Sequence, residues 1–151
     1  ELEEVFKELG EERYYRKIAM SICKRRQKKP ITSTQDLVDI VLGCKPRTSK
    51  RHPATNIFRA IRMKVNQELL ELHKVLDEAS KVLKFGGRLV VISFHSIEDR
   101  IVKRFILGKE KIDRPVKFKP VGKNPLKPTK EEVNRNPRSR SAILRVAEKV
   151  A

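Results

Sequence analysis

The sequence has little aromatic content: no tryptophan, two tyrosines and six phenylalanines among 151 residues. Proteins that bind single-stranded nucleic acid often stack the bases on exposed aromatic rings, so we do not expect a stacking platform of that kind. No apolar run approaches the ~18–20 residues that a membrane-spanning helix needs, and we therefore expect no membrane association. The first residues are acidic and amphipathic, and they lack the pattern of a secretory signal.

Cysteine and glycine are also scarce. Cys23 and Cys44, the only cysteines, lack the spacing of metal ligands, so we expect buried thiols in a reducing compartment and no metal site. The six glycines form no G-x-G-x-x-G element, although a doubly wound domain normally begins with a strand and such a cofactor-binding turn. The sequence begins instead, without methionine, inside a predicted helix. We therefore expect it to be part of a longer chain.

Basic residues, by contrast, are abundant. The 36 lysines and arginines outnumber the 19 acidic residues, and the formal net charge is +17. The excess is spread along the sequence, so it is a property of the whole surface. Such a surface favours a polyanionic partner, and nucleic acid is the first candidate. The alternative is a basic surface that serves solubility or heat resistance alone.

The most informative stretch runs from Gly86 to Arg100. Its centre, Leu89 to Ile92, is a short continuous apolar run that predicts a strand buried on both faces. From Ile97 onwards the apolar period becomes helical, with acidic residues in the first turn, where they suit the helix dipole. Ligands of open α/β sheets bind at the carboxyl ends of the strands. The residues at that predicted edge are Ser93, Phe94, His95 and Ser96.

Upstream of this stretch the patterns are helical. Two helices are predicted before residue 30, and a third begins near residue 33 with a capping box. Its cap is either Thr32 with Gln35 or Ser33 with Asp36. A long helix of about eight turns is then predicted from Pro53 to Leu83, because apolar residues recur at spacings of three and four throughout. It ends at a glycine pair that precedes the predicted strand.

Downstream, the patterns are weaker. They predict a short strand around Phe118, a capped helical turn from Thr129 and a basic turn over Asn136–Arg140. Apolar residues alternate over Ser141–Val150, which predicts a last strand. The sequence therefore predicts an α/β protein with few strands, whose sheet needs further residues.

Three segments together resemble a known family. Residues 52–69 (HPATNIFRAIRMKVNQEL), 86–105 (GGRLVVISFHSIEDRIVKRF) and 136–142 (NPRSRSA) resemble the bacterial methyltransferases that modify N4 of a cytidine in small-subunit ribosomal RNA. The shorter segments GEERY at residues 10–14 and PITST at residues 30–34 also resemble this family. The resemblance extends from about residue 9 to residue 147.

The resemblance implies a class I S-adenosylmethionine-dependent methyltransferase, with a Rossmann-like α/β sheet and a helical domain inserted in it. Residues 1–50 would be the end of the helical insertion, and residues 51–151 the carboxy-terminal part of the methyltransferase domain. The family's amino-terminal half, which carries the cofactor-binding residues, has no counterpart here, so no cofactor residue is expected in this chain. The resemblance also implies ribosomal RNA or the small ribosomal subunit as partner and a cytoplasmic location, and it leaves a homodimer open.

To methylate an exocyclic cytosine amine, an enzyme must hold the amine in line with the methyl group and accept hydrogen bonds from its protons. It must also bring the base out of any stack. Ser93, His95 and Ser96 are the candidate catalytic residues, and Phe94 is a candidate for packing on the base. In the alternative interpretation, His95 and Ser96 cap the following helix and Phe94 belongs to the core.

Basic residues near the start of the long helix, and in the turn before the last strand, are candidates for contacts with RNA phosphates. They are Lys50, Arg51, His52, Arg59, Arg62, Arg138 and Arg140. For each of them the alternative is a solvated surface charge. For the whole chain the alternative is a non-catalytic, basic RNA-binding module derived from the same family. A structural protein of the ribosome is disfavoured by the buried-strand pattern and the polar cluster after it.

Overall fold

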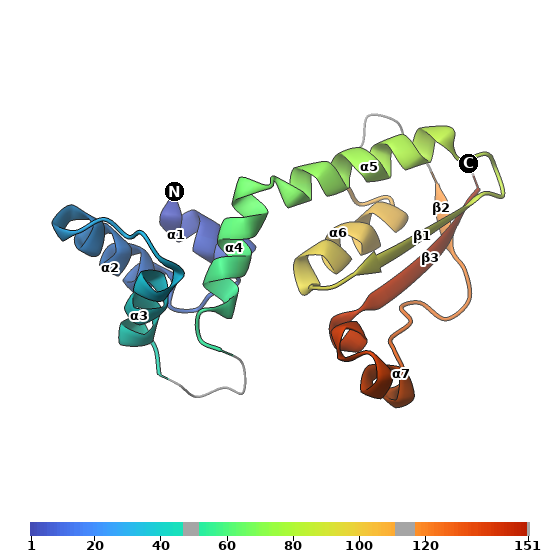
Figure 1. Ribbon diagram of the computed structural model, residues 1–151. Coiled ribbons are helices and arrows are strands. Elements are labelled where there is room, and N and C mark those ends of the chain that lie inside the picture. Colours follow the sequence, from blue (N-terminus) through green and yellow to red (C-terminus); the bar gives the residue numbers. More distant parts are fainter. Residues whose placement is uncertain (47–51, 111–116, 151) are drawn as a thin grey trace. The chain divides into compact units, whose positions relative to one another are not determined.

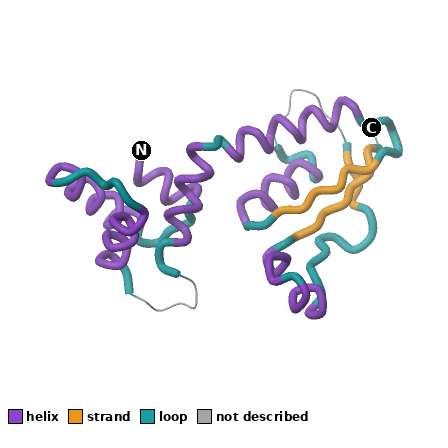
Figure 2. The backbone as a smooth tube through the Cα atoms, viewed as in Figure 1, coloured by secondary structure: helices purple, strands orange, loops and turns teal. Residues whose placement is uncertain are grey.

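The computed structural model describes residues 1–46, 52–110 and 117–150, which form two compact units, Glu1–Glu68 and Leu69–Ala151. Figures 1 and 2 show a first unit built of helices and a second unit that contains a small sheet. The sequence-based boundary near residue 50 concerns an insertion in a longer protein, and it stays a prediction. Within the described residues no helix is both long and apolar enough to span a bilayer.

The first unit contains five helical segments around one apolar core. They are α1 (Leu2–Glu4), the π-helix η1 (Val5–Leu9), α2 (Tyr15–Lys28), α3 (Thr34–Cys44) and α4 (Thr55–Val65). Every segment from η1 to α4 contributes at least one fully buried side chain to this core: Phe6, Ile18, Val41, Ile57 and Ala60. The apolar period of α2 correctly predicted Ile18 and Ile22 on its buried face. In α4 the predicted stripe included Val65, which is 73% exposed, and the buried face is formed by Ile57, Ala60 and Met63.

A capping box begins α3, and it is the second of the two alternatives. The hydroxyl oxygen of Ser33 accepts the backbone N–H of Asp36 at 3.1 Å, and the Asp36 carboxylate accepts the backbone N–H of Ser33 at 3.2 Å. The hydroxyl of Ser33 also donates to that carboxylate and is the main reason why the pKa of Asp36 lies below its usual value. The cap satisfies two backbone donors that the first turn leaves without a helical partner.

The prediction of one long helix from Pro53 to Leu83 is wrong. The helix is broken after Val65, and α5 begins at Glu68 and ends at Val82. Between them Gln67 has φ +52°, a left-handed conformation that interrupts the helical hydrogen bonds. The break is held by Glu68, whose carboxylate accepts hydrogen bonds from Arg62 at 2.7 and 3.1 Å and from Asn66 at 3.3 Å.

The second unit is an antiparallel three-stranded sheet with helices on one face. Its elements after α5 are β1 (Arg88–Ser93), α6 (Ser96–Ile106), β2 (Phe118–Pro120), α7 (Lys130–Arg135), the 3₁₀ helix η2 (Pro137–Ser141) and β3 (Ile143–Lys149). The strand order is β1-β3-β2, and all three predicted strands are present (Figure 1). In the register Leu89 pairs with Ala147 and Ser93 with Ile143.

One face of this sheet packs against helices. Ala147 is fully buried there, together with Val102 and Phe105 of α6, and the ring of Phe105 lies 5.4 Å from that of Phe118. On the same face of β3, the ammonium group of Lys149 donates to the carbonyl oxygens of Ser80 and Leu83 at 2.7 and 2.8 Å, which satisfies carbonyls at the end of α5.

The other face of β1 is bare, so the prediction of a strand buried on both faces is wrong for these residues. Val90 and Ile92 are 58% and 57% exposed, and they lie on the same face as their register partners Val146 and Leu144. The reason is topological, because both packed helices lie on the opposite face. Among the described residues β1 also has a strand neighbour on only one side. The apolar run indicates a strand that is suited to burial on both faces. The described residues of the chain cover only one of these faces.

Candidate functional site

The turn between β1 and α6 carries the four residues predicted at the ligand edge. Ser93 ends the strand with its side chain facing inwards, and the residue is 2% exposed. Phe94 faces outwards and is 54% exposed, so it is not a core residue. Ser96 begins α6 and is also exposed. The structure therefore places the four residues in one turn but divides their side chains between the interior and the surface.

His95 is the N-cap of α6. Its Nδ1 accepts the backbone N–H of Glu98 at 3.3 Å, and the carboxylate of Glu98 accepts the backbone N–H of Phe94 at 2.9 Å. This reciprocal arrangement resembles a capping box, with histidine in the place of serine or threonine and with the carboxylate bonded to the residue before the cap. Because Nδ1 is an acceptor, the neutral ring carries its proton on Nε2. The capping alternative for His95 is thus present in the structure, and a chemical role for the imidazole stays a prediction.

Glu98 holds this turn from the helix side. His95 Nε2 lies 3.3 Å from Oε1 of Glu98, although the alignment is too poor for a hydrogen bond. The pKa of Glu98 is lowered, first by the facing imidazole and then by the N–H of Phe94, and partial burial opposes this effect. The carboxylate is therefore ionised at neutral pH and fixes both the ring and the backbone of the turn.

A nearly buried ion pair anchors α6 to β3, and sequence reasoning missed it. Arg145 donates from Nε and Nη2 to the two carboxylate oxygens of Asp99, at 2.7 and 2.9 Å. The two side chains are only 11% and 16% exposed. The one available signal was an arginine on the inward-facing side of a strand, between Ile143 and Ala147. This pair sets the position of the first turn of α6, and with it the turn that carries His95.

The basic residues predicted near the start of α4 are mostly engaged within the protein. Arg59 donates to the carbonyl oxygen of Gly10 at 2.7 Å, and Arg62 binds Glu68 as described above. His52 is exposed, and its Nδ1 accepts the backbone N–H of Ala54 at 3.3 Å. Lys50 and Arg51 lie outside the described residues. Arg59 therefore supports the fold through the GEERY segment at residues 10–14, a segment that the sequence had marked only by resemblance.

Arg138 and Arg140 are different, because their side chains are exposed on η2 and have no acidic partner among the residues that the structure describes. The turn itself is held by Ser139, which is buried and donates its hydroxyl to the carbonyl oxygen of Asn136 at 2.8 Å. The segment NPRSRSA at residues 136–142 thus combines a buried serine that fixes the turn with two arginines that face solvent. Both arginines remain candidates for phosphate contacts.

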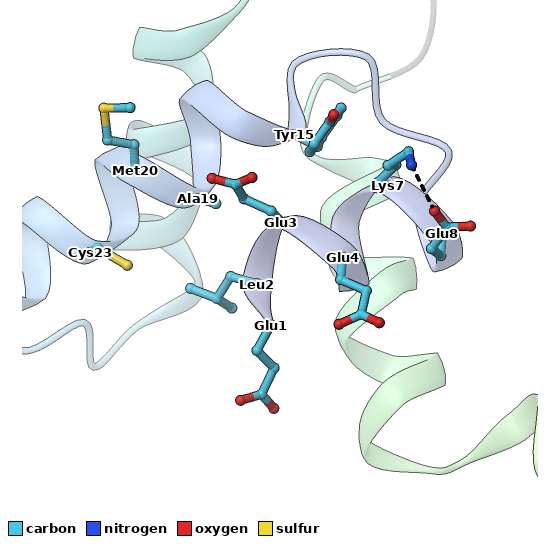
Figure 3. A pocket seen from close by; sticks show the side chains of 10 residues that line it. All are labelled: Glu1, Leu2, Glu3, Glu4, Lys7, Glu8, Tyr15, Ala19, Met20 and Cys23. Atoms are coloured by element: carbon cyan, nitrogen blue, oxygen red, sulfur yellow. Dashed lines mark ion pairs between the residues drawn. The ribbon is translucent and has the colours of Figure 1, made fainter.

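A hollow of about 610 Å³ lies between α1 and α2, and its lining includes none of the predicted site residues. Its lining is acidic on one side, with Glu1, Glu3, Glu4 and Glu8. Figure 3 shows that these carboxylates point in different directions, and Glu8 pairs with Lys7 at 3.2 Å. An acidic lining opposes RNA, and the divergent carboxylates do not assemble a cation site.

Two features of the segments around β1 bear on cofactor binding. Gly86 and Gly87 precede β1 instead of following it, and they form the turn between α5 and the strand. At the other end of β1 the backbone N–H groups of Phe94 and Glu98 are already bonded within the capping box. These two backbone donors are therefore already used within the turn.

Comparison with known proteins identifies the chain's relatives. A profile of the MraW methylase family matches residues 1–150. A ribosomal RNA small subunit methyltransferase H of Legionella pneumophila (strain Paris) is 48% identical over 100% of this chain and 53% of its own length. The proteins of the same name in Caldicellulosiruptor saccharolyticus and Coxiella burnetii (strain Dugway 5J108-111) are each 46% identical, over 99% and 94% of this chain.

The chain spans about half of the length of these relatives, 53% in two cases and 50% in the third. The mixed composition of helices and a small sheet is consistent with part of an α/β methyltransferase. Because the profile covers almost every residue and the identities are high, the resemblance seen in the sequence is confirmed. The chain belongs to the MraW methylase family.

Proposed function

We propose that this chain is the carboxy-terminal portion of an enzyme that transfers a methyl group from S-adenosylmethionine to N4 of a cytidine in small-subunit ribosomal RNA. The observation that carries the proposal is the family match over residues 1–150, together with relatives at 46–48% identity that are named ribosomal RNA small subunit methyltransferases. Residues 1–50 would complete a helical insertion that contacts the substrate, and residues 51–151 would complete the methyltransferase domain.

In this proposal the cofactor is bound mainly by residues outside the chain. Two features of β1 support this view. Its edge away from β3 could pair with a further strand, and its exposed Val90 and Ile92 form an apolar face that further helices could cover. The chain's own contribution is then the turn from Ser93 to Ser96, which would orient the cytosine, and the cationic surface that would hold the RNA backbone.

The direct test is a chimera of the amino-terminal half of the Legionella pneumophila relative with this chain. Purified chimera, radiolabelled S-adenosylmethionine and small ribosomal subunits lacking the modification should yield N4-methylcytidine, identified by mass spectrometry of digested RNA. The 151-residue chain alone should yield none. A chimera that folds, binds S-adenosylmethionine and methylates no ribosomal RNA would refute the proposal and favour the non-catalytic RNA-binding module.

Substitutions at His95 in the chimera separate chemistry from capping. Asparagine is a good N-cap, whereas alanine removes the cap and costs about 1 kcal/mol of stability. If the imidazole takes part in the reaction, as proposed, His95→Asn and His95→Ala both lower methyl transfer tenfold or more. A His95→Asn enzyme with the wild-type rate would show that the ring only caps α6. Ser93→Ala is expected to lower the rate similarly in a folded enzyme.

A further inference from the structure

The helix α2 presents a strongly cationic surface. Between residues 13 and 35 the sequence contains no acidic residue and eight basic ones: Arg13, Arg16, Lys17, Lys24, Arg25, Arg26, Lys28 and Lys29. The buried face of the helix is apolar, with Ile18, Ala19 and Ile22 in the core, so the charges are confined to the remaining surface. Such a concentration of one sign destabilises the folded unit by self-repulsion unless an anion binds to it.

A shallow cleft of about 340 Å³ lies beside this surface, between α2 and α3. It is lined by Ser21, Lys24, Arg25 and Lys28 from α2 and by Asp39, Ile40, Gly43 and Cys44 from α3. Ser21, Lys24 and Lys28 follow each other at spacings of three and four, which places them along one side of the helix. The cleft is therefore a groove with a row of polar and cationic side chains on one wall.

The two lysines of the groove are available to a ligand. Lys24 and Lys28 are exposed, and neither has an acidic partner among the residues described. Arg25 is partly engaged instead, with Nη1 3.3 Å from the carbonyl oxygen of Lys29 and Nη2 3.6 Å from the Asp36 carboxylate. The one acid of the lining, Asp39, accepts a hydrogen bond from Gln35 at 2.7 Å.

Gly43 gives a second, independent indication. It lies in the last turn of α3, it is exposed, and a Cβ added to it would meet nothing within 4 Å. Glycine inside a helix is less favourable than alanine, and the fold has room for alanine at this position. A bare backbone at the edge of the groove instead allows a ligand to approach α3 closely.

We propose that the groove between α2 and α3 binds the sugar–phosphate backbone of RNA, with Lys24 and Lys28 each contacting a phosphate and Gly43 allowing close approach. This inference rests on the proposed function, which supplies RNA as the polyanion. An acidic protein is a weaker fit, because Ile40 is the only large apolar side chain of the lining and protein interfaces are usually centred on larger apolar anchors. Contacts of this kind position RNA without reading its sequence.

The test measures binding of a short fluorescein-labelled RNA hairpin to the 151-residue chain by anisotropy over a range of salt concentrations. Removing two phosphate contacts with Lys24→Ala/Lys28→Ala should reduce the slope of log K against log salt by about 1.4–1.8. It should also weaken binding at least about fivefold near 0.1 M salt. The matched control is Lys7→Ala/Lys81→Ala, which removes the same charge from lysines already paired with acids at 3.2 and 2.6 Å.

Gly43→Ala separates affinity from stability. Alanine should raise the melting temperature of the chain and yet weaken RNA binding, a combination that damage to the fold cannot produce. The inference is overturned if the lysine double variant and the control bind with the same affinity and slope, or if poly-glutamate competes as well as unlabelled RNA. Because no methyl donor is present, the outcome is independent of methyl transfer, and a chimera without activity would leave this measurement unaffected.

Discussion

The ion pair between Asp99 and Arg145 should be the largest single polar contribution to the second unit. Its two hydrogen bonds, of 2.7 and 2.9 Å, join side chains that are only 16% and 11% exposed. Removing one partner from such a pair leaves the other charge nearly buried without compensation, which costs about 3 kcal/mol. We therefore expect Asp99→Ala and Arg145→Met each to cost about that much, and the double variant to cost clearly less than their sum.

The assay must report on the second unit alone, because the chain has two compact units and a global signal would combine the unfolding of both. The only tyrosines, Tyr14 and Tyr15, lie in the first unit, so tyrosine fluorescence follows that unit and serves as an internal control. Hydrogen exchange of the β1 and β3 amides, measured by mass spectrometry of peptides, follows the second unit. A loss of about 3 kcal/mol accelerates exchange by about two powers of ten where exchange requires opening of the sheet.

The comparison pair is Arg88 and Glu148, which connects β1 to β3 at 3.7 Å with side chains 63% and 37% exposed. An exposed pair of this kind contributes between about 0 and 1 kcal/mol, so Glu148→Ala should change the exchange less than about fivefold. If Asp99→Ala and Arg145→Met have effects as small as Glu148→Ala, or add without coupling, the pair does not anchor α6 and the reasoning is refuted.

Two further predictions concern the same unit. The folded-state pKa of Glu98 lies below its usual 4.5, so its contribution to stability is complete above that pH and is lost as the pH falls through the lowered value. Thermal melts should show a steeper loss below about pH 4.5 for the wild type than for Glu98→Gln, and parallel profiles would contradict this. The double substitution Val90→Thr/Ile92→Thr should lower the free energy of unfolding by less than about 1 kcal/mol and should reduce self-association in light scattering. The control Val102→Thr, in the core, should lower it more. A large loss of stability in the double variant would mean that this face of β1 is already covered.

Local patterns were sufficient to predict most of the helices and all three strands. The helix from Ser96 and the strand Ile143–Lys149 follow from apolar periods, and the start of α3 follows from a capping box whose partners are three residues apart. Each of these signals depends on neighbours within one or two turns. The sequence contains that information directly, and it is the reason why all three strands were found.

The break between α4 and α5 could not be predicted in the same way. Asn66, the C-cap of α4, is a residue type that can end a helix, but the apolar stripe continues through it and outweighed that single signal. The positive φ of Gln67 has a conformational cost and persists because Glu68 is held by Arg62 from the preceding helix. A contact between side chains on either side of the break decides the structure there. The spacing of apolar residues carries no information about such a contact.

The exposure of one face of β1 also could not be predicted from the residues of the strand itself. The run Leu89–Ile92 is suited to burial on both faces, but cover comes from elements that pack against a strand. Within the described residues those elements, α5 and α6, lie on one face. The residue pattern of a strand thus indicates the environment to which the strand is suited. Its actual environment depends on all the elements that pack against it.

The same distinction applies to the basic residues. Arg59 and Arg62 were predicted to contact RNA, yet each is bonded to an oxygen within the first unit, whereas Lys24, Lys28, Arg138 and Arg140 have no acidic partner among the residues described. A charge that is already paired with an acid releases few counterions when RNA binds, so it contributes little to the salt dependence. Substitution of Arg62, which is paired with Glu68, should therefore change the salt slope little. Arg59 is bonded to a neutral carbonyl oxygen and keeps its charge, so its contact with RNA stays a prediction. Substitution of Lys24 and Lys28 should change the slope in a chain that stays folded. The salt slope therefore distinguishes cations that stabilise the fold from cations that are available to RNA.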